Sequence, residues 1–350
     1  MEKVFSATLS GGVSSDVYFS LSLAELRDRI ISYGDNAIYI FDENTRPLLD
    51  LDSARCLTLD SGEENKNYQS IDKIIRFALS RGCARDTIFV AIGGGVVCDM
   101  TAFASSIFMR GARVVLVPTT LLSMVDASVG GKTGIDYMGY KNLIGSFFPA
   151  EDILITLECL KSLDEEQFVS GLGEVVKHAF LAKDEELFNF LLNERESILS
   201  RELSSLCTVV RLSLDVKKYY IEADPEERRG IRSFLNLGHT FSHALETCTN
   251  YAISHGKGVA WGLKRAFDVS LNLGLCSESY YGKALSLLSL YPFDIDAQLD
   301  VSMLPSYMEA IKKDKKRKDG SVKFVLVKGQ GELVLKPLTE AEILSVVVQS

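Results

Sequence analysis

The sequence has few cysteines, and none are arranged to form a cross-link or a structural metal site. Its 350 residues include seven cysteines, an odd number, and no two follow CxxC spacing. Structural disulfides and a zinc ribbon are therefore not expected, and free thiols suit a reducing compartment. No run approaches the roughly 20 apolar residues that span a membrane. The opening MEKVFSATLSGG lacks the apolar stretch of a signal peptide. We expect a cytoplasmic protein with no membrane segment.

The sequence also lacks an excess of positive charge. Lysine and arginine number 38 against 47 acidic residues, which gives a formal net charge of −9. This balance argues against nucleic acid or an anionic membrane as a partner. A phosphorylated substrate would have to be held by a local basic pocket. The length favours two domains, because single cores rarely grow beyond about 250–300 residues.

Strand and helix patterns alternate in the first part of the chain. Short apolar runs at 37–41, 87–92 and 114–117 are each followed by turn residues, and 68–80 and 96–109 have helical periodicity. Alternation of this kind predicts a doubly wound α/β domain, which we assign to residues 1–160.

The pattern becomes helical beyond residue 164, and a domain boundary is expected near 158–165. Few β signals occur until 324–327, so a mainly α-helical second domain is predicted over residues 161–350. Such two-domain enzymes usually have their active site in the cleft between the domains. The expected helices are 170–182, 185–193, 203–221, 234–248 and 259–273.

Glycines follow the second predicted strand and precede a helix. Gly93, Gly94 and Gly95 would let backbone amides approach a pyrophosphate at the helix N-terminus. The signal is weak, since such glycines more often form a plain turn, and the string is not GxGxxG. Asp42 and Asn44 follow another predicted strand, where a ribose could bind, although from the residues alone a surface turn is the favoured explanation.

The four histidines are a sharper signal. His239, His243 and His255 fall within seventeen residues, and His178 follows Glu174 at helical spacing. Three clustered histidines with a glutamate suggest a metal site. Spacing alone favours His239 with His243, one turn apart on a helix, and Glu174 with His178 by the same rule. It cannot choose between these pairs.

Several basic residues could bind phosphate or carboxylate. Lys132 follows Gly130 and Gly131, which would allow close backbone approach to an anion, although the string is not a P-loop. The basic run at 312–318 is most simply a solvated loop. The others are Arg110, Lys141, Lys177 and Arg232.

Taken together, these strings resemble the 3-dehydroquinate synthase family. They occur in the family order and at the family spacing over roughly residues 40–330. The strings are SGE at 61–63 with Lys66, GGGVV at 93–97 with Asp99, RG at 110–111, PTTLL at 118–122 with Asp126, GGK at 130–132, KN at 141–142, Glu174 with Lys177, Arg232 with LNLGHTF at 235–241 and His243, HG at 255–256, and DKK at 314–316.

The resemblance implies an N-terminal nucleotide-binding domain and a helical C-terminal domain. It implies zinc, or cobalt in its place, held by Glu174, His239 and His255, which differs from the pairing that spacing favours. It gives His178 no functional role. It also implies bound NAD, with contacts from Asp42, Asn44, Glu63, Lys66, Gly94, Gly95, Val96, Asp99, Thr119, Thr120, Leu122, Lys132 and Lys141.

The resemblance also implies the reaction. The family converts 3-deoxy-D-arabino-heptulosonate 7-phosphate to 3-dehydroquinate and phosphate. The implied catalytic residues are Asp126, Lys132, Lys177 and His243. The implied substrate contacts are Arg110, Lys132, Asn142, Arg232, Asn236, His243 and Lys316, and a homodimer is expected in which Arg110 reaches the substrate bound to the neighbouring chain.

Other readings remain. Related cyclases, 2-deoxy-scyllo-inosose synthase and 2-epi-5-epi-valiolone synthase, act on sugar phosphates without a carboxylate, and retention of Arg232 argues against them. Glycerol-type metal-dependent dehydrogenases and a non-catalytic NAD-binding protein are more distant alternatives.

The sequence departs from the family pattern in two places. Cys98 and Ala102 replace common glycines and are small enough to be harmless. Arg228 stands where the family often has glutamate, with Glu227 one residue earlier. Either this loop carries an extra residue or an acidic contact is lost.

Overall fold

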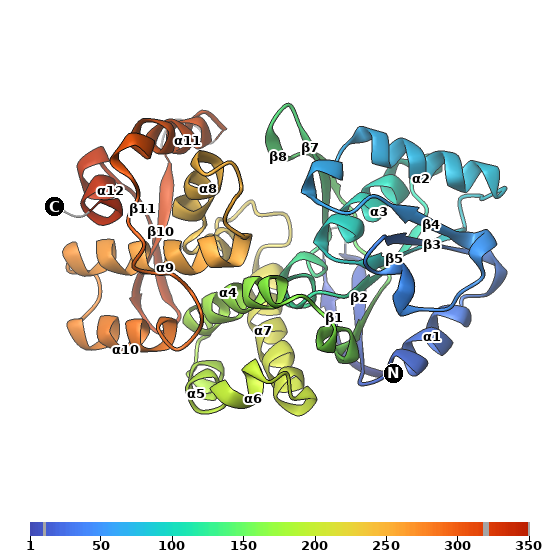
Figure 1. Ribbon diagram of the computed structural model, residues 1–350, viewed down its shortest axis with the longest axis horizontal. Coiled ribbons are helices and arrows are strands. Elements are labelled where there is room, and N and C mark those ends of the chain that lie inside the picture. The colour runs from blue at the N-terminus through green and yellow to red at the C-terminus, as the bar shows by residue number, and fades with distance from the viewer. Residues whose placement is uncertain (10–11, 318–321, 349–350) are drawn as a thin grey trace. The chain divides into compact units, whose positions relative to one another are not determined.

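A seven-stranded sheet organises the N-terminal part of the protein (Figure 1). The computed structural model describes residues 1–9, 12–317 and 322–348, with side chains over the same ranges except 313–317. β1 runs antiparallel to β2, and every other pairing in the sheet is parallel. In spatial order the strands are β1 (Glu2–Thr8), β2 (Ser14–Ser20), β9 (Asp152–Thr156), β6 (Arg113–Pro118), β5 (Ile88–Gly93), β3 (Ala37–Asp42) and β4 (Cys56–Leu59).

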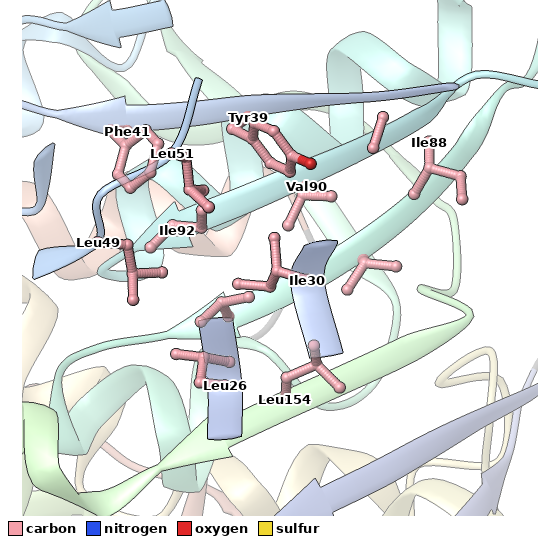
Figure 2. Packing of buried hydrophobic residues seen from close by; sticks show 13 residues of the cluster. Leu26, Ile30, Tyr39, Phe41, Leu49, Leu51, Ile88, Val90, Ile92 and Leu154 are labelled. Atoms are coloured by element: carbon pink, nitrogen blue, oxygen red, sulfur yellow. The ribbon is translucent and has the colours of Figure 1, made fainter. Parts of the chain in front are cut away.

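The central strands are buried on both faces, which explains their unbroken apolar sequences. Ile88, Val90 and Ile92 of β5 point to one face and pack with Leu26 and Ile30 of α1 (Leu23–Ile31), as Figure 2 shows. The opposite face meets α3 (Gly95–Ile107), which packs on β5 and β6 and also contacts α2 (Tyr68–Ser80). Helices therefore cover both faces, as the predicted doubly wound fold requires.

The strand order changes direction at β3. From β3 the chain adds β4 on one side, then returns to place β5 on the other side. In open α/β sheets, ligands bind outside the carboxyl ends of the strands at such a switch point. The carboxyl ends of β3 and β5 carry Asp42 and the Gly93–Gly95 turn. A separate hairpin, β7 (Lys132–Tyr137) with β8 (Tyr140–Phe147), packs on α3.

The C-terminal part is mainly helical, as predicted. The helix α9 is its centre, because α4, α8, α10, α12 and β10 all pack on it. The helices are α4 (Glu165–Leu181), α5 (Glu186–Asn193), α6 (Arg195–Leu199), α7 (Leu203–Ala223), α8 (His239–Cys248), α9 (His255–Asn272), α10 (Glu278–Leu288), α11 (Leu304–Arg317) and α12 (Glu340–Val347), with a hairpin of β10 (Lys323–Gly329) and β11 (Glu332–Pro337).

Polar side chains define where several helices begin. Asp164 caps α4 by accepting hydrogen bonds from the backbone of Glu166 and Gln167. Thr339 and Glu342 form a reciprocal capping box at α12. The Asp164 cap explains why α4 begins at 165, five residues before the helix predicted at 170–182.

The remaining predicted elements differ mainly at their ends. The helix expected over 234–248 is split, since Gly238 has φ +79° and separates the short η9 (Arg232–Asn236) from α8. Sequence patterns did not indicate β1, β2, β4, β9, the β7–β8 hairpin or β11. The strands at 37–41, 87–92, 114–117 and 324–327 and the helix at 68–80 are confirmed.

The chain divides into two compact units. One comprises Met1–Leu163 with Ile221–Arg228, and the other comprises Asp164–Tyr220 with Arg229–Ser350. The sequence placed Ile221–Arg228 in the second domain, whereas this segment, which includes the end of α7, belongs to the first unit. Within the described ranges, no helix is both long and apolar enough to cross a membrane.

Candidate functional site

Three potential metal ligands converge within the helical unit. Glu174 lies on α4, His239 is the first residue of α8, and His255 is the first residue of α9. The Nε2 atoms of His239 and His255 each lie 3.3 Å from Oε1 of Glu174. One ligand atom from each residue falls within 4.8 Å of the others. Two imidazoles and one carboxylate form the donor set of an open catalytic zinc site.

Glycines next to these residues allow the three helices to approach closely. A Cβ atom on Gly173 would lie 2.1 Å from the carbonyl oxygen of Gly256, so α4 and α9 touch through their backbones. A Cβ on Gly262 would lie 2.2 Å from the carbonyl oxygen of Gly238, so the start of α8 lies equally close to α9. Each ligand therefore follows or precedes a glycine at a helix contact, which places all three together.

Hydrogen bonds set the orientation of both imidazoles. His239 Nδ1 lies 3.2 Å from the carbonyl oxygen of Leu237, and His255 Nδ1 lies 3.0 Å from Oε1 of Glu246. Nδ1 must carry a proton to donate in both cases, so in the neutral rings Nε2, the atom nearest Glu174, is the nitrogen left to bind a cation. Metal-binding histidines are commonly oriented in this way.

Charge around the site favours an ionised carboxylate. Glu174 is fully buried, and its Oε2 pairs with the ammonium of Lys177, which is 1% exposed. Burial raises the pKa of Glu174, but Lys177 and His239 lower it by more, so its pKa lies well below the usual range. Burial lowers the pKa of His255, whereas its bonds to Glu174 and Glu246 raise it, to about 10 in the metal-free protein.

The other histidines occupy different surroundings. His243 is exposed on α8, with its ring 5.4 Å from that of His239 and 6.0 Å from that of His255. A second set of potential ligands, with His243, Glu246 and His255, shares one histidine with the first. His178 is fully buried in α4. The pairing of His239 with His243 that spacing favours is thus not among the ligand sets found in the described part of the chain.

Several of the predicted nucleotide residues follow the carboxyl ends of β3, β5 and β6. Gly94 is the N-cap of α3 and supplies no side chain to its first turn. The amide of Thr119 donates to the carbonyl oxygen of Gly93, 3.0 Å away, which joins the ends of β5 and β6. A Cβ on Gly94 would lie 3.3 Å from Thr120, so glycine keeps this turn compact. Uncapped helix amides next to such a turn form a phosphate-binding arrangement.

Asp42 is the last residue of β3, and Asn44 lies in the turn that follows. The Asp42 carboxylate accepts hydrogen bonds from the backbone and hydroxyl of Thr45, each 2.8 Å long. Thr45 also lies 2.9 Å from the carbonyl oxygen of Ile92, which connects this turn to the end of β5. Asn44 is exposed beside it, while Leu122 is half-buried beyond the end of β6.

Other predicted nucleotide residues make polar contacts with one another and with Asn142. Lys66, which is 4% exposed, donates to Asp99 on α3 and to the side-chain oxygen of Asn142, each at 2.7 Å. Lys141 lies 3.7 Å from Glu63. The structure therefore places Asn142, predicted as a substrate contact, among the predicted nucleotide contacts.

The loop of residues 224–230 retains an acidic contact, although its sequence departs from the family pattern. Glu227 has φ +58°, and its carboxylate lies 2.5 Å from Nζ of Lys132. Arg228 is largely exposed and pairs with Glu226 at 2.8 Å. An acidic contact is thus present, but Glu227 makes it, one residue earlier than the family pattern places it.

The remaining predicted residues come from several elements. Asp126 is half-buried in η7 (Ser123–Ala127), Arg232 is 3% exposed at the start of η9, and Asn236 is half-buried at its end. Arg110 is exposed with φ +67°. The side chain of Lys316 lies outside the described residues.

Sequence reasoning missed some buried polar groups. Glu246, Ser242, Lys217 and Asp224 are each at most 5% exposed, yet none belongs to a spacing motif. The one available signal was the helical spacing of Ser242 and Glu246 in a segment that contains His243, which is too common to be informative.

Family models match both parts of the chain. The model for the N-terminal domain of 3-dehydroquinate synthase matches residues 56–170, and the model for its C-terminal domain matches residues 171–317. The chain belongs to the 3-dehydroquinate synthase family. The second match includes all three converging ligands, whereas Asp42 and Asn44 lie before the first match.

Individual relatives agree with the family assignment. The 3-dehydroquinate synthase of Francisella tularensis subsp. tularensis is 38% identical over 296 residues, which cover 84% of this chain and 81% of that protein. A bifunctional 3-dehydroquinate synthase/phosphatase of Fusobacterium nucleatum is 36% identical over 325 residues. That match covers 91% of this chain but 48% of the bifunctional protein, so the chain spans about half of that relative's length.

A solved structure supports the fold assignment. The 2-epi-5-epi-valiolone synthase of Streptomyces hygroscopicus subsp. jinggangensis, with NAD+ and Zn2+ bound, superposes with a TM-score of 0.83 at 25% identity. The superposition covers 95% of this chain and 96% of that one. The fold is therefore that of the sugar phosphate cyclases, which include the 3-dehydroquinate synthase family.

Proposed function

We propose that the protein is a 3-dehydroquinate synthase that converts 3-deoxy-D-arabino-heptulosonate 7-phosphate to 3-dehydroquinate and inorganic phosphate. It would be a carbon–oxygen lyase of the route to aromatic amino acids. The observation that carries this proposal is the convergence of Glu174, His239 and His255 in a chain of this family.

The residues present fit both a divalent metal and NAD. A buried carboxylate and two Nε2 atoms converge on one point, as zinc requires. The uncapped glycine turn at α3 suits a dinucleotide phosphate. When bound, the metal would acidify a substrate hydroxyl and NAD would exchange hydride with the substrate carbon.

The chain's own residues would orient the substrate and move its protons. Lys177 keeps Glu174 ionised, so that the carboxylate is ready to bind a cation. Arg232, with its planar guanidinium, suits a bidentate pair with the substrate carboxylate. Lys132 would join that contact, held in place by Glu227. His243, exposed beside the two histidine ligands, would meet the phosphate and carry a proton during its elimination.

Residues of the first unit would hold the nucleotide. Gly94, Gly95 and Val96 would offer backbone amides to its phosphates, and Asp42 would accept from a ribose hydroxyl. Asp126 and Lys132 would lie near its reacting end. Arg110, Asn236 and Lys316 would complete the contacts to the substrate phosphate.

The main alternative is a cyclase whose substrate has no carboxylate. The similarity to a valiolone synthase supports a shared scaffold, but that protein is 25% identical, against 38% for a relative named as a dehydroquinate synthase. Arg232 distinguishes the two possibilities, because its planar guanidinium suits a bidentate pair with a carboxylate, which only the heptulosonate phosphate carries.

Substrate preference tests this proposal. With NAD+ and Zn2+ supplied, phosphate release should be rapid with the heptulosonate phosphate and at least 100-fold slower with a heptulose phosphate that lacks the carboxylate. Arg232→Met should remove most of this difference by slowing only the first reaction. Faster release from the substrate without a carboxylate would assign the protein to the other class of cyclase.

We also propose a homodimer in which Arg110 reaches the phosphate of the substrate bound to the neighbouring chain. Both Met109 and Arg110 have positive φ, which holds Arg110 outward at the end of α3. Within the described residues, the Arg110 side chain makes no hydrogen bond or ion pair, so no such contact holds it to its own helix. Exposed Met109, Leu143 and Phe147 offer apolar surface on the neighbouring elements.

We place the enzyme in the cytoplasm. All seven cysteines are free, as expected for a reducing compartment.

A further inference from the structure

A buried carboxylate lies behind one of the candidate metal ligands. Glu246 on α8 is 2% exposed, and its Oε1 lies 3.0 Å from Nδ1 of His255. The hydroxyl of Ser242, one helical turn earlier, donates to the same oxygen at 2.8 Å. Ser242 is itself fully buried. A buried carboxylate is costly unless it is paired, so this arrangement is specific rather than incidental.

The helix α9 leaves room for this pair. A Cβ atom on Gly258 would lie 2.6 Å from Oγ of Ser242 and 3.5 Å from Oε1 of Glu246. Any larger residue at 258 would push the hydroxyl away from the carboxylate. Gly258 therefore allows Ser242 and Glu246 to fit against α9 close to His255.

The hydrogen bond determines which nitrogen of His255 can bind a cation. A neutral imidazole carries one proton, and donation from Nδ1 to Glu246 leaves the lone pair on Nε2. That atom lies 3.3 Å from Oε1 of Glu174. His239 is oriented by a backbone carbonyl instead, so of the two histidines only His255 depends on a charged acceptor. The charge of Glu246 also makes the lone pair of His255 Nε2 more basic and so a stronger metal ligand.

We propose that Glu246, held by Ser242 in the space left by Gly258, is a positioning residue that fixes His255 for metal binding. This inference rests on the proposed function, because it assumes a metal at Glu174, His239 and His255. The competing arrangement makes Glu246 itself a ligand, together with His243 and Nδ1 of His255. It is disfavoured because His243 is exposed, whereas Glu174 and His239 are buried.

Metal affinity of the full-length protein tests the role of Glu246. Zn2+ dissociation constants would be measured by competition with a chromophoric chelator, and coordination would be followed from the Co2+ absorption spectrum. Glu246→Gln should weaken Zn2+ binding by about 10- to 100-fold, the range found when such partners of metal-bound histidines are removed. The stoichiometry should stay at one ion, and the Co2+ spectrum should keep its shape. Glu186→Gln, the same change at an exposed site on α5, should bind as the unaltered chain does.

Two variants that leave Glu246 in place test the arrangement independently. Ser242→Ala removes one hydrogen bond and should weaken binding by roughly three- to tenfold. Gly258→Ala should weaken it as well, because its methyl displaces the Ser242 hydroxyl. In the double variant the obstructed hydroxyl is absent, so affinity should match that of Ser242→Ala alone rather than fall further. Ser242→Ala and Gly258→Ala also test the positioning role if Glu246→Gln does not fold.

Any other outcome contradicts either the positioning role of Glu246 or the proposed metal site. Unchanged affinity in Glu246→Gln, or additive losses in the double variant, would refute the positioning role while leaving the metal site intact. A changed Co2+ spectrum in Glu246→Gln would show that Glu246 is a ligand, which also refutes it. Failure of the unaltered chain to bind any divalent metal would refute the proposed metal site, and this inference with it.

Discussion

At the scale of single residues, the two neighbouring histidines His243 and His255 are expected to have different roles. His255 points Nε2 at the buried Glu174, whereas His243 is exposed. His255→Ala should therefore lose bound metal, and His243→Ala should retain it while losing turnover. Metal content after dialysis, measured together with activity, checks both. The reverse pattern would support the pairing of His239 with His243 that helical spacing favours.

The contact between Glu227 and Lys132 gives a second prediction at this scale. Glu227→Gln should lower kcat/KM about fivefold, because Lys132 loses the charge that holds it, an effect kept small by its solvent exposure. The melting temperature should not change. Glu226→Gln is the matched control, because its partner Arg228 is exposed and has no proposed role. Equal effects of the two substitutions on kcat/KM would show that Glu227 has no specific function.

At the scale of helices and strands, the contact between α4 and α9 determines whether a metal site exists. A Cβ atom on Gly256 would lie 1.6 Å from the carbonyl oxygen of Ser170, so Gly256→Ala must separate the two helices. We expect a loss of about 1–3 kcal/mol in stability from overpacking and a weaker affinity for Zn2+. Thermal unfolding and chelator competition measure the two effects.

Gly282 provides the control for this substitution. It lies inside α10, and a Cβ atom placed on it would meet no atom within 4 Å, so Gly282→Ala should stabilise the protein by roughly 0.5–1 kcal/mol through helix propensity. Its metal affinity should be unchanged. If Gly256→Ala behaved in the same way, close helix contact would not be what assembles the site.

The sequence predicted these elements best where local signals were strong. The buried strand at 88–93 and the amphipathic helix at 68–80 follow from their own periodicity. The edge strand β1 and its neighbour β2 were missed because they alternate weakly and are stabilised by pairing, β1 with β2 and β2 with β9. The helix predicted over 234–248 did not take account of Gly238, which has a left-handed backbone and lies too close to α9 for a side chain.

At the scale of the whole molecule, the candidate site joins residues far apart in sequence. Glu174 and His255 are separated by 81 positions, and only the packing of α4 on α9 brings them together. Helical spacing describes neighbours on one helix, so it paired His239 with His243 and Glu174 with His178. The family resemblance supplied the set that the structure brings together. Neither route found Glu246, whose role depends on a contact between α8 and α9.

The proposed dimer makes a prediction that involves two chains. Homodimers of Arg110→Ala and of Lys132→Ala should each be nearly inactive, because each loses a charged contact to the substrate. If Arg110 acts across the interface, a mixed dimer carries both defects in one site and has one intact site. Activity should then return, to at most about half per mixed dimer, when the two variants are unfolded and refolded together.

The mixing experiment requires evidence that mixed dimers form, for which differently tagged chains can be isolated in sequence. If Arg110 acts within its own chain, every site of the mixed dimer carries one defect and no activity returns. A monomeric protein at assay concentrations would also contradict the proposal.

The most direct test of the central claim is the balance of products and nucleotide in a single assay. The heptulosonate phosphate would be added to the metal-loaded protein with NAD+ at a small fraction of the substrate concentration. We predict one phosphate and one 3-dehydroquinate per substrate consumed, many turnovers per NAD+, and no accumulation of NADH. Growth of NADH absorbance in proportion to substrate consumed, without release of phosphate, would contradict the account and indicate a simple dehydrogenase.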